Sequence, residues 1–157
     1  MRKFEKISKE QYEKDLKELC SYEDISIPTR STKHSAGYDF KSPIEFTLNP
    51  GESKKVPTGI KASMNEDEFL AILVRSSMGF KYNMRLCNQV GIVDSDYYNN
   101  PDNEGDIIIA LETVRPDTDC CFKQGDAIAQ GIIVPFYKVE DDNAEGDRVG
   151  GFGSTGN

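Results

Sequence analysis

Two aspartates separated by one residue, Asp94 and Asp96, lie in the segment richest in reactive side chains, NQVGIVDSDYY at 88–98. On an extended strand, residues two apart face the same side, so both carboxylates would share one face and Tyr97 would point to the other. Carboxylates at this spacing fit a general base with a partner, or a pair of ligands for metal-bound water, and an ordinary polar turn is the alternative. His34 is the only histidine, which excludes a serine-histidine-aspartate relay and a histidine-rich metal cage. The candidates for a general base are therefore Asp94 and Asp96.

A second group of residues has the chemistry of a phosphate-binding site. Arg75, Ser76 and Ser77 come just after the apolar run FLAIL at 69–73, where a strand would end. A guanidinium can fork to two phosphate oxygens, and neighbouring hydroxyls can donate to the same group at close range. Serines that cap the next turn are an equally simple interpretation.

The C-terminal stretch VGGFGSTGN at 149–157 is too rich in glycine to pack as a helix or strand, because glycine loses the most backbone entropy on ordering. Its glycine amides and the hydroxyls of Ser154 and Thr155 can donate to phosphate oxygens, while Phe152 offers a flat face to a base. Arg148 stands close enough to clamp a terminal phosphate. A tail that orders on a nucleotide is one interpretation of this composition, and a disordered polar terminus, the usual state of chain ends, is the other.

Two shorter strings complete the set. AGYDF at 36–40 contains Asp39, and GDAIAQ at 125–130 ends in Gln130. Each alone is typical of an ordinary turn at a strand end. Their value depends on which other groups they meet in the fold.

One substantial helix is predicted over 10–19. Ser8 and Gln11 form a capping box, and apolar or aromatic residues recur from Tyr12 at i, i+4 and i+7.

Short apolar stretches broken by turn residues follow the helix and predict an all-β fold, a jelly-roll-like antiparallel β-barrel. The expected strands lie at 25–27, 44–48, 53–56, 60–64, 69–74, 88–94, 106–114 and 127–139. We expect residues 1–139 to form the barrel domain with its N-terminal helix, and 140–157 to form an acidic linker and a glycine-rich lid.

At 157 residues the chain is long enough for one domain with a real core. The net charge of −8 and the isoelectric point near 4.7 argue against a nucleic-acid partner or an anionic membrane surface. No apolar run approaches the ~20 residues that span a bilayer, and the first ten residues lack the apolar centre of a signal peptide. The four cysteines show no metal-ligand spacing. We therefore expect a cytoplasmic protein with mostly buried thiols.

Taken in order, AGYDF, VRSSMG, NQVGIVDSDYY, GDAIAQ and GGFGSTG resemble the five motifs of the trimeric dUTPases, across residues 36–156. The resemblance implies hydrolysis of dUTP to dUMP and pyrophosphate, which limits uracil entry into DNA and supplies dUMP for dTMP synthesis. It also implies Mg²⁺ on the triphosphate and a homotrimer whose active sites lie between subunits. The N-terminal helix, together with the three departures described below, is reminiscent of members from Gram-positive bacteria and their phages.

Carried over position by position, Asp94 matches the base that activates water for attack on the α-phosphorus. Tyr97 matches the aromatic residue that packs against deoxyribose and leaves no room for a ribose 2′-hydroxyl. Asn88, with backbone groups around Val90 and Gly91, matches the hairpin that hydrogen-bonds uracil.

Asp39 matches the residue that holds water on the magnesium. Ser76 and Gln130 match residues that contact the phosphates, and Arg75 matches a supporting arginine. Arg148 and the tail match a lid that closes over the base and the γ-phosphate. The resemblance implies substrate contacts from Arg75, Ser76, Ser77, Asn88, Val90, Gly91, Tyr97, Gln130, Arg148, Phe152, Gly153, Ser154 and Thr155.

Three departures stand out. After DSDY the chain reads YNNPDNEGD where the family commonly has a short Arg-Gly or Gln-Gly turn. Ala127 stands where many members have arginine, and the stretch between Arg148 and GGFG is one residue shorter than the common pattern.

Two rival functions remain open. A dCTP deaminase shares the fold and an arginine-serine-serine string, although the GGFGSTG tail and the aspartate of GIVDSDY fit the dUTPase pattern better. A nucleotide-sensing regulatory protein would bind dUTP and a protein partner through the long YYNNPDNEGD loop. Release of ammonia from dCTP would favour the first rival.

Overall fold

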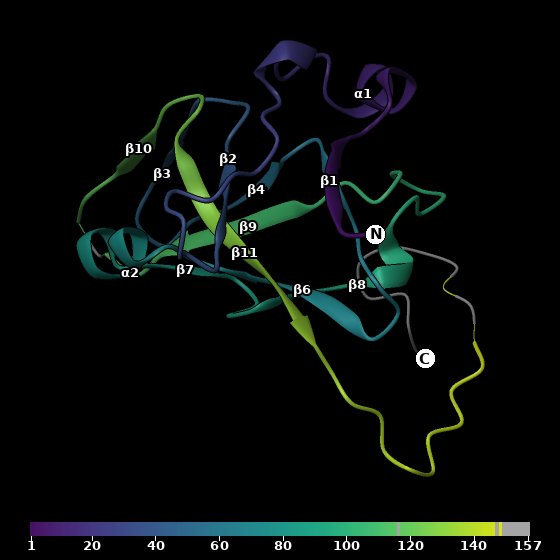
Figure 1. Ribbon diagram of the computed structural model, residues 1–157. Coiled ribbons are helices and arrows are strands. Elements are labelled where there is room, and N and C mark those ends of the chain that lie inside the picture. Colours follow the sequence, from purple (N-terminus) through teal and green to yellow (C-terminus); the bar gives the residue numbers. More distant parts are fainter. Residues whose placement is uncertain (116, 147, 149–157) are drawn as a thin grey trace.

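The computed structural model describes residues 1–115, 117–146 and 148, and these residues form an almost entirely β structure (Figure 1). Its strands are β1 (Lys3–Lys6), β2 (Tyr38–Lys41), β3 (Phe46–Leu48), β4 (Ser53–Pro57), β5 (Ile60–Ser63), β6 (Glu68–Leu73), β7 (Met84–Leu86), β8 (Gly91–Asp94), β9 (Ile108–Thr113), β10 (Cys120–Phe122) and β11 (Ala127–Pro135). The helices are α1 (Lys9–Asp15) and α2 (Ser76–Tyr82), with 3₁₀ turns η1 (Tyr22–Asp24) and η2 (Ser95–Tyr97).

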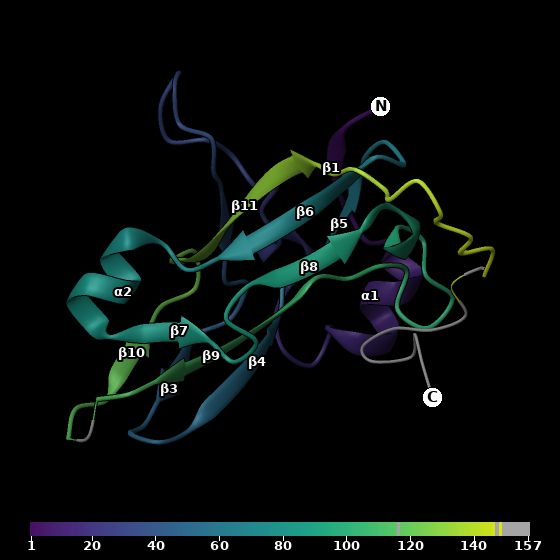
Figure 2. The same cartoon turned by 90° about the horizontal axis from the view of Figure 1, so that it is seen from below.

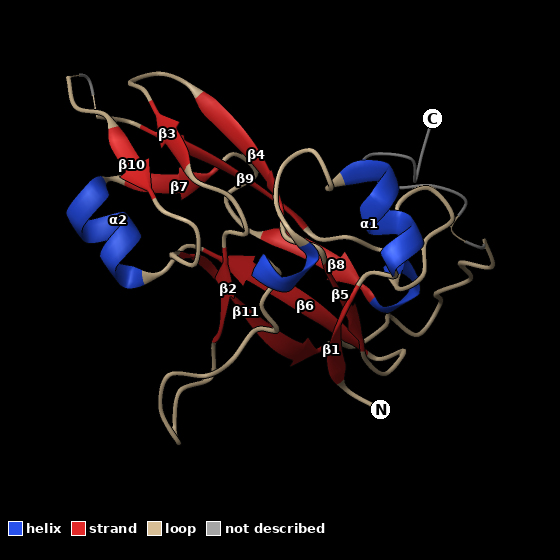
Figure 3. Ribbon diagram, turned by 90° about the horizontal axis from the view of Figure 1, so that it is seen from above, coloured by secondary structure: helices blue, strands red, loops and turns tan. Residues whose placement is uncertain are grey.

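Two larger sheets enclose the core (Figure 3). One has the strand order β2-β11-β6-β8 and the other β4-β9-β7, while β1 pairs with β5 and β10 with β3. The strand pairs described are antiparallel. One cluster of buried side chains draws on all four sheets. The expected all-β, antiparallel, jelly-roll-like architecture with a short N-terminal helix is confirmed.

A glycine at the centre of β11 lets three strands pack closely. Gly131 lies opposite Tyr38 of β2 and Ile72 of β6. A Cβ atom added there would lie 2.7 Å from the Phe40 ring and 2.9 Å from Leu70 Cδ1, closer than real Cβ contacts come. Both of those side chains are fully buried. The space above Gly131 is therefore filled by its neighbours, which holds β2 and β6 at a fixed spacing.

Helix α1 is shorter than the predicted helix over 10–19. The Oγ of Ser8 accepts a hydrogen bond from the Gln11 N–H at 3.1 Å, as expected for a helix cap. The reciprocal half of the capping box is absent, because the Ser8 N–H donates instead to the Glu104 carboxylate at 3.0 Å. The helix ends at Asp15, and Leu19 is 53% exposed. The apolar periodicity at Leu19 therefore reflects a turn rather than a helix face.

Other expected elements differ from those observed. Residues 25–27 do not form a strand, and only a single bridge between Thr29 and Asp39 holds that stretch to β2. Helix α2, which follows Arg75, was not expected, and its C-cap residue Asn83 has a left-handed φ of 53°. The expectation of mostly buried thiols is also wrong. All four cysteines are free, and only Cys120 is buried.

After β11 the chain leaves the sheets (Figure 1). Residues 136–146 contain no helix or strand. No helix among the described residues is long and apolar enough to cross a membrane.

Candidate functional site

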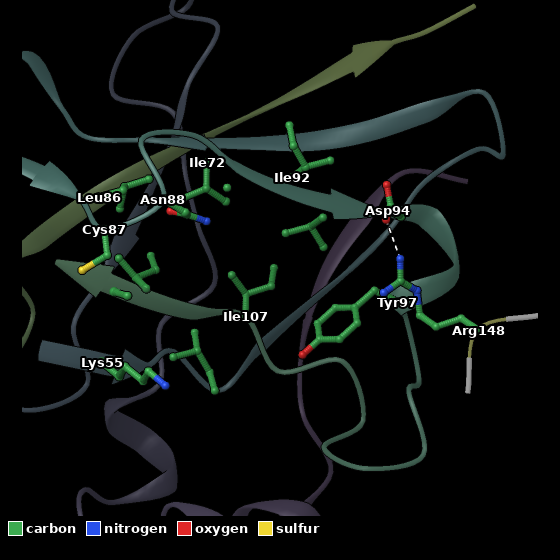
Figure 4. Close-up of a pocket in the computed structure, with 15 residues that line it drawn as sticks. Lys55, Ile72, Leu86, Cys87, Asn88, Ile92, Asp94, Tyr97, Ile107 and Arg148 are labelled. Carbon is green, nitrogen blue, oxygen red and sulfur yellow. Dashed lines mark hydrogen bonds and ion pairs between the residues drawn. The ribbon is translucent and has the colours of Figure 1, made fainter. Parts of the chain in front are cut away.

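A pocket of about 430 Å³ opens between the two larger sheets (Figure 4). Ile72 of β6 and β8 line one side, and residues 107–110 line the other. The walls are mainly apolar. The side chains that bring polar atoms to the pocket are Lys55, Asn88, Asp94, Tyr97 and Arg148.

The two aspartates are brought together by a turn rather than by a strand. Asp94 is the last residue of β8 and lies opposite Phe69 of β6, and Asp96 lies within η2. Because the chain turns at Ser95, Tyr97 lines the same pocket as Asp94. The expectation that Tyr97 points away from Asp94 is therefore wrong.

Arg148 joins both carboxylates. Its Nη2 forms an ion pair with Asp94 Oδ2, and its Nε lies 2.7 Å from Asp96 Oδ1. The guanidinium carbon lies 5.9 Å from the centre of the Tyr97 ring, a cation–π distance. The Arg148 side chain is 14% exposed, whereas the two carboxylates are about half exposed. Figure 4 shows Arg148 at the Tyr97 end of the pocket. A positive charge thus lies beside the candidate base, where a phosphate would also be attracted.

Tyr97 closes that end of the pocket. The residue is 7% exposed, and its hydroxyl donates to the Asp106 carbonyl at 3.2 Å. Desolvation by burial raises the pKa of the phenol, so the hydroxyl stays protonated at neutral pH. Tyr97 therefore presents a fixed neutral ring to the pocket.

Asn88 lies in the turn between β7 and β8. These strands pair in different sheets, so residues 87–90 cross from one sheet to the other. The Val90 N–H donates to the Asn88 carbonyl at 2.7 Å. A Cβ at Gly91 would lie 3.1 Å from Ile72 Cβ and 3.6 Å from Asn88 Nδ2. Asn88 and Gly91 line the pocket, and Val90 is 42% exposed in the same turn.

The carboxyl of Asp106 is buried behind the pocket. Its Oδ1 accepts from the Gly59 N–H at 2.8 Å, and the residue is 3% exposed. Burial raises the pKa of Asp106 to about 7. The next residue, Ile107, lines the pocket. Asp106 thus places a buried, protonatable carboxyl directly before this wall in the chain.

Stability should consequently fall as pH rises from 5 to 8. In that window folded Asp106 keeps a proton that the unfolded chain has released, so its stabilising contribution is lost as pH rises through 7. The expected loss is roughly 3 kcal/mol in the free energy of unfolding. Asp106→Asn keeps the acceptor for Gly59 and should flatten this slope in urea unfolding at the two pH values.

The exposed Asp102→Asn substitution is the matched control and should keep the wild-type slope. The lowered pKa values of Glu5, Glu68 and Glu104 give losses only as pH falls below their usual range, outside this window. An unchanged slope in Asp106→Asn would contradict the prediction.

A second polar cluster combines three of the motifs. Asp39 of β2 lies opposite Gln130 of β11, and Arg75 occupies the N-cap position of α2. Arg75 Nε lies 3.0 Å from Asp39 Oδ1, and the Ser31 hydroxyl donates to Asp39 Oδ2 at 2.7 Å. Gln130 Nε2 donates to the Val74 carbonyl at 3.1 Å. These contacts hold the arginine and the amide at the end of β6.

Ser76 and Ser77 begin α2 beside this cluster, and both are exposed. In the part of the chain that the structure describes, neither hydroxyl forms a hydrogen bond and no side chain caps this helix. The capping alternative is therefore not supported by the geometry. Both hydroxyls face solvent at the cluster.

The two clusters are far apart within one chain. Asp94 lies opposite Phe69 near the start of β6, whereas Arg75 follows its end. Six residues of extended chain span roughly 20 Å. Figure 2 shows the same separation. Helix α2 lies at one end of the paired strands β6 and β8, and the 3₁₀ turn η2, which follows β8, lies at the other end. Within one chain the candidate base Asp94 therefore lies far from the cluster around Arg75, whereas Arg148 does reach Asp94.

Four of the expected contacts, Phe152, Gly153, Ser154 and Thr155, lie outside the described residues. Sequence reasoning missed Lys55 and Asn103, which donates to the Tyr97 hydroxyl at 2.8 Å. Lys55 stands in an ordinary polar strand, SKKVP, and Asn103 in a polar loop, so neither carried a distinguishing signal.

A family model and curated relatives match most of the chain. The dUTPase family model matches residues 23–156. A curated relative, the deoxyuridine 5′-triphosphate nucleotidohydrolase of Lactococcus lactis, is 45% identical over 134 residues, which covers 84% of this chain and 89% of the relative. That of Burkholderia lata is 37% identical over 150 residues, covering 90% and 97%.

Solved structures show the same fold. The dUTPase of Streptococcus mutans superposes with a TM-score of 0.74 at 35% identity and covers 88% of this chain and 98% of that one. The dUTPase of phage phi11 of S. aureus has a TM-score of 0.70 at 20% identity, covering 93% and 97%. On the family match and on these relatives, the chain belongs to the dUTPase family.

Proposed function

We propose that this protein hydrolyses dUTP to dUMP and pyrophosphate by attack of water on the α-phosphorus. The observation that carries the proposal is the pocket between the sheets, which has Asn88 at one end and Tyr97 with Asp94 at the other (Figure 4). Its mainly apolar walls suit a base and a sugar, and its exposed carboxylate suits a water. The names of the relatives support the same reaction.

In this mechanism Asp94 accepts a proton from the attacking water. The side chain of Asn88 and the backbone of Val90 and Gly91 bind the uracil edge. Tyr97 packs against the deoxyribose, since its ring closes the pocket next to Asp94. Hydrolysis at an anionic phosphorus needs an aligned water and neutralised charge more than a covalent nucleophile.

The phosphates are bound by Arg75, Ser76, Ser77 and Gln130. The exposed serine hydroxyls and the Arg75 guanidinium, held by Asp39, form a donor surface for phosphate oxygens.

The donor set at Asp39 fits Mg²⁺ bound through water. Mg²⁺ usually keeps several waters and binds through one or two carboxylates together with substrate phosphates. Among the described residues, no three His, Cys, Asp or Glu side chains form a metal cage, which agrees with a metal that arrives on the triphosphate. Bound Mg²⁺ would neutralise phosphate charge. Asp39 would accept hydrogen bonds from its waters while continuing to orient Arg75.

The complete site requires a second copy of the chain. One copy supplies Asp94 with the nucleoside pocket, and a neighbour supplies Arg75 with the phosphate-binding groups, because these lie roughly 20 Å apart within one chain. Contacts that use different surfaces on the two partners close into rings, and we propose the homotrimer of the dUTPase family.

Residues 148–157 complete the site as a lid. Phe152 stacks on the base, and Gly153, Ser154 and Thr155 donate to the phosphates. Arg148 contacts the γ-phosphate, for which its ion pairs with Asp94 and Asp96 must be exchanged. We place the enzyme in the cytoplasm, where reduced cysteines such as its four free thiols are usual.

Pyrophosphate release from dUTP, dTTP, dCTP and UTP, measured side by side with Mg²⁺ or with EDTA, tests the proposal. We expect dUTP to be hydrolysed at least about 100-fold faster than the others, and EDTA to remove most of the activity. Ammonia from dCTP would identify a deaminase instead. Tight dUTP binding without pyrophosphate would identify a nucleotide-sensing regulatory protein.

A further inference from the structure

The loop between η2 and β9, residues 98–105, contacts the pocket-lining Tyr97 through the side chain of Asn103. Asn103 Nδ2 donates to the Tyr97 hydroxyl at 2.8 Å and to the Asp106 carbonyl at 3.2 Å. The same hydroxyl donates its proton to the Asp106 carbonyl. Both hydrogen-bonding roles of the phenol are therefore used behind the ring. A tilt of the ring would break contacts that are largely shielded from water.

The loop is itself anchored on both sides of Asn103. The Glu104 carboxylate accepts from the Ser8 N–H and forms an ion pair with Lys61, whose Nζ also donates to Asn99 Oδ1 at 2.8 Å. Lys61 is only 9% exposed. Lys14 Nζ donates to the Asp102 carbonyl at 3.0 Å. These anchors come from the N-terminal segment and from β5, so the loop is held from outside the pocket.

The backbone of the loop returns directly against Tyr97. Gly105 has a φ of +85°, a conformation that favours glycine, and a Cβ there would lie 2.5 Å from the Tyr97 carbonyl oxygen. The Gly105 N–H donates to Asn103 Oδ1 at 3.1 Å. The Asn103 side chain is thus held by the backbone of its own loop as well as by Tyr97.

We propose that Asn103 is a positioning residue that holds the Tyr97 ring in place, and that the 98–105 loop thereby sets discrimination between deoxyribose and ribose. This inference rests on the proposed function. A ribose differs by one oxygen, and a wall rejects that oxygen only if it cannot move by about an ångström. The anchored loop supplies that rigidity from behind the ring, although Asn103 itself does not contact the substrate.

A double-mutant cycle tests the proposal. We compare wild type, Asn103→Ala, Tyr97→Phe and the double variant by the ratio of kcat/KM for dUTP to that for UTP. Each single variant should lower the ratio about tenfold, mainly through a lower KM for UTP, because the ring loses its rear anchor. The loss in the double variant should be clearly smaller than the product of the two single losses, because both substitutions remove the Asn103–Tyr97 hydrogen bond.

Asp102→Asn is the matched control, since Asp102 is exposed in the same loop and its two described hydrogen bonds are made by backbone atoms. It should leave the ratio close to wild type. Additive losses in the double variant, or an equal loss in Asp102→Asn, would overturn the proposal in favour of a general structural role. If Asn103→Ala does not fold, the nearly isosteric Tyr97→Phe still carries the test.

Hydrogen exchange separates this inference from the proposed function, because it needs no substrate. Tyr97→Phe should speed amide exchange at Gly105 and Asp106, whose N–H groups donate to Asn103. Unchanged amide exchange at Gly105 and Asp106 would overturn the proposed link between the 98–105 loop and the Tyr97 ring. A wild-type protein that releases no pyrophosphate from dUTP would overturn the proposed function alone.

Discussion

Asp94→Asn is expected to abolish most dUTP hydrolysis while leaving the fold and nucleotide binding intact. The amide cannot take a proton from the attacking water, and loss of a general base costs on the order of 10²–10⁴ in rate. Asp94 is about half exposed at the end of β8, so the substitution buries no new polar group. Single-turnover hydrolysis and dUMP binding, measured on the same preparation, separate the chemical step from affinity.

Asp96→Asn is the matched control. Both carboxylates pair with Arg148, so each substitution removes one ion pair from the same guanidinium. Only Asp94 is among the residues that line the pocket. Asp96→Asn should therefore retain most activity. The reverse result, with Asp94→Asn active and Asp96→Asn inactive, would move the base to Asp96.

Arg75→Ala is expected to reduce turnover by about 10²–10³, although Arg75 lies roughly 20 Å from Asp94 in its own chain. The guanidinium is proposed to bind phosphates whose nucleoside sits on a neighbouring copy. Removing it also leaves Asp39 without its ion pair, which frees the carboxylate that is proposed to hold the waters of the metal. Steady-state kinetics with dUTP and binding of dUMP should show a larger loss in turnover than in monophosphate binding.

Arg85→Ala provides the control for this substitution. Arg85 forms an exposed ion pair with Glu112 between β7 and β9, away from both clusters. Such surface pairs contribute about 0–1 kcal/mol, so activity should be unchanged. Comparable losses in the two variants would indicate that charge on the surface, rather than a specific phosphate contact, explains the effect.

Much of the fold could be predicted from local patterns. The run FLAILV identified β6, because a continuous apolar stretch bounded by turns is typical of a strand buried on both faces. Helix α2 gave no such signal. Of its seven residues only Met78 is buried, and Phe80 is 94% exposed, so no apolar face repeats along it.

The site was predictable in its residue types but not in its arrangement. Asp39, Arg75 and Gln130 come from distant motifs and meet because β2 and β11 pair in register. No spacing in the sequence encodes that register. The position of Tyr97 was mistaken for a related reason, since the 3₁₀ turn at 95–97 depends on how the chain leaves β8.

Asn103 shows a third limit. It belongs to a polar stretch, YNNPDNEGD, in which several asparagines look equivalent. Asn103 differs from Asn99 only through the three-dimensional path that brings its amide to the Tyr97 hydroxyl. Composition marks the segment as a loop, whereas tertiary packing determines which of its side chains matters.

Mixing Asp94→Asn with Arg75→Ala protein tests the central claim, a site assembled from two copies, most directly. Subunits with different affinity tags are unfolded together, refolded and purified through both tags, and dUTP hydrolysis is then measured. Each parent should be nearly inactive. In rings of three that carry both tags, one site in three combines an intact Asp94 with an intact Arg75 from the neighbour, so about a third of wild-type activity should return. Mixed oligomers that remain as inactive as their parents would show that one chain supplies both residues to its own site, and would contradict the shared active site.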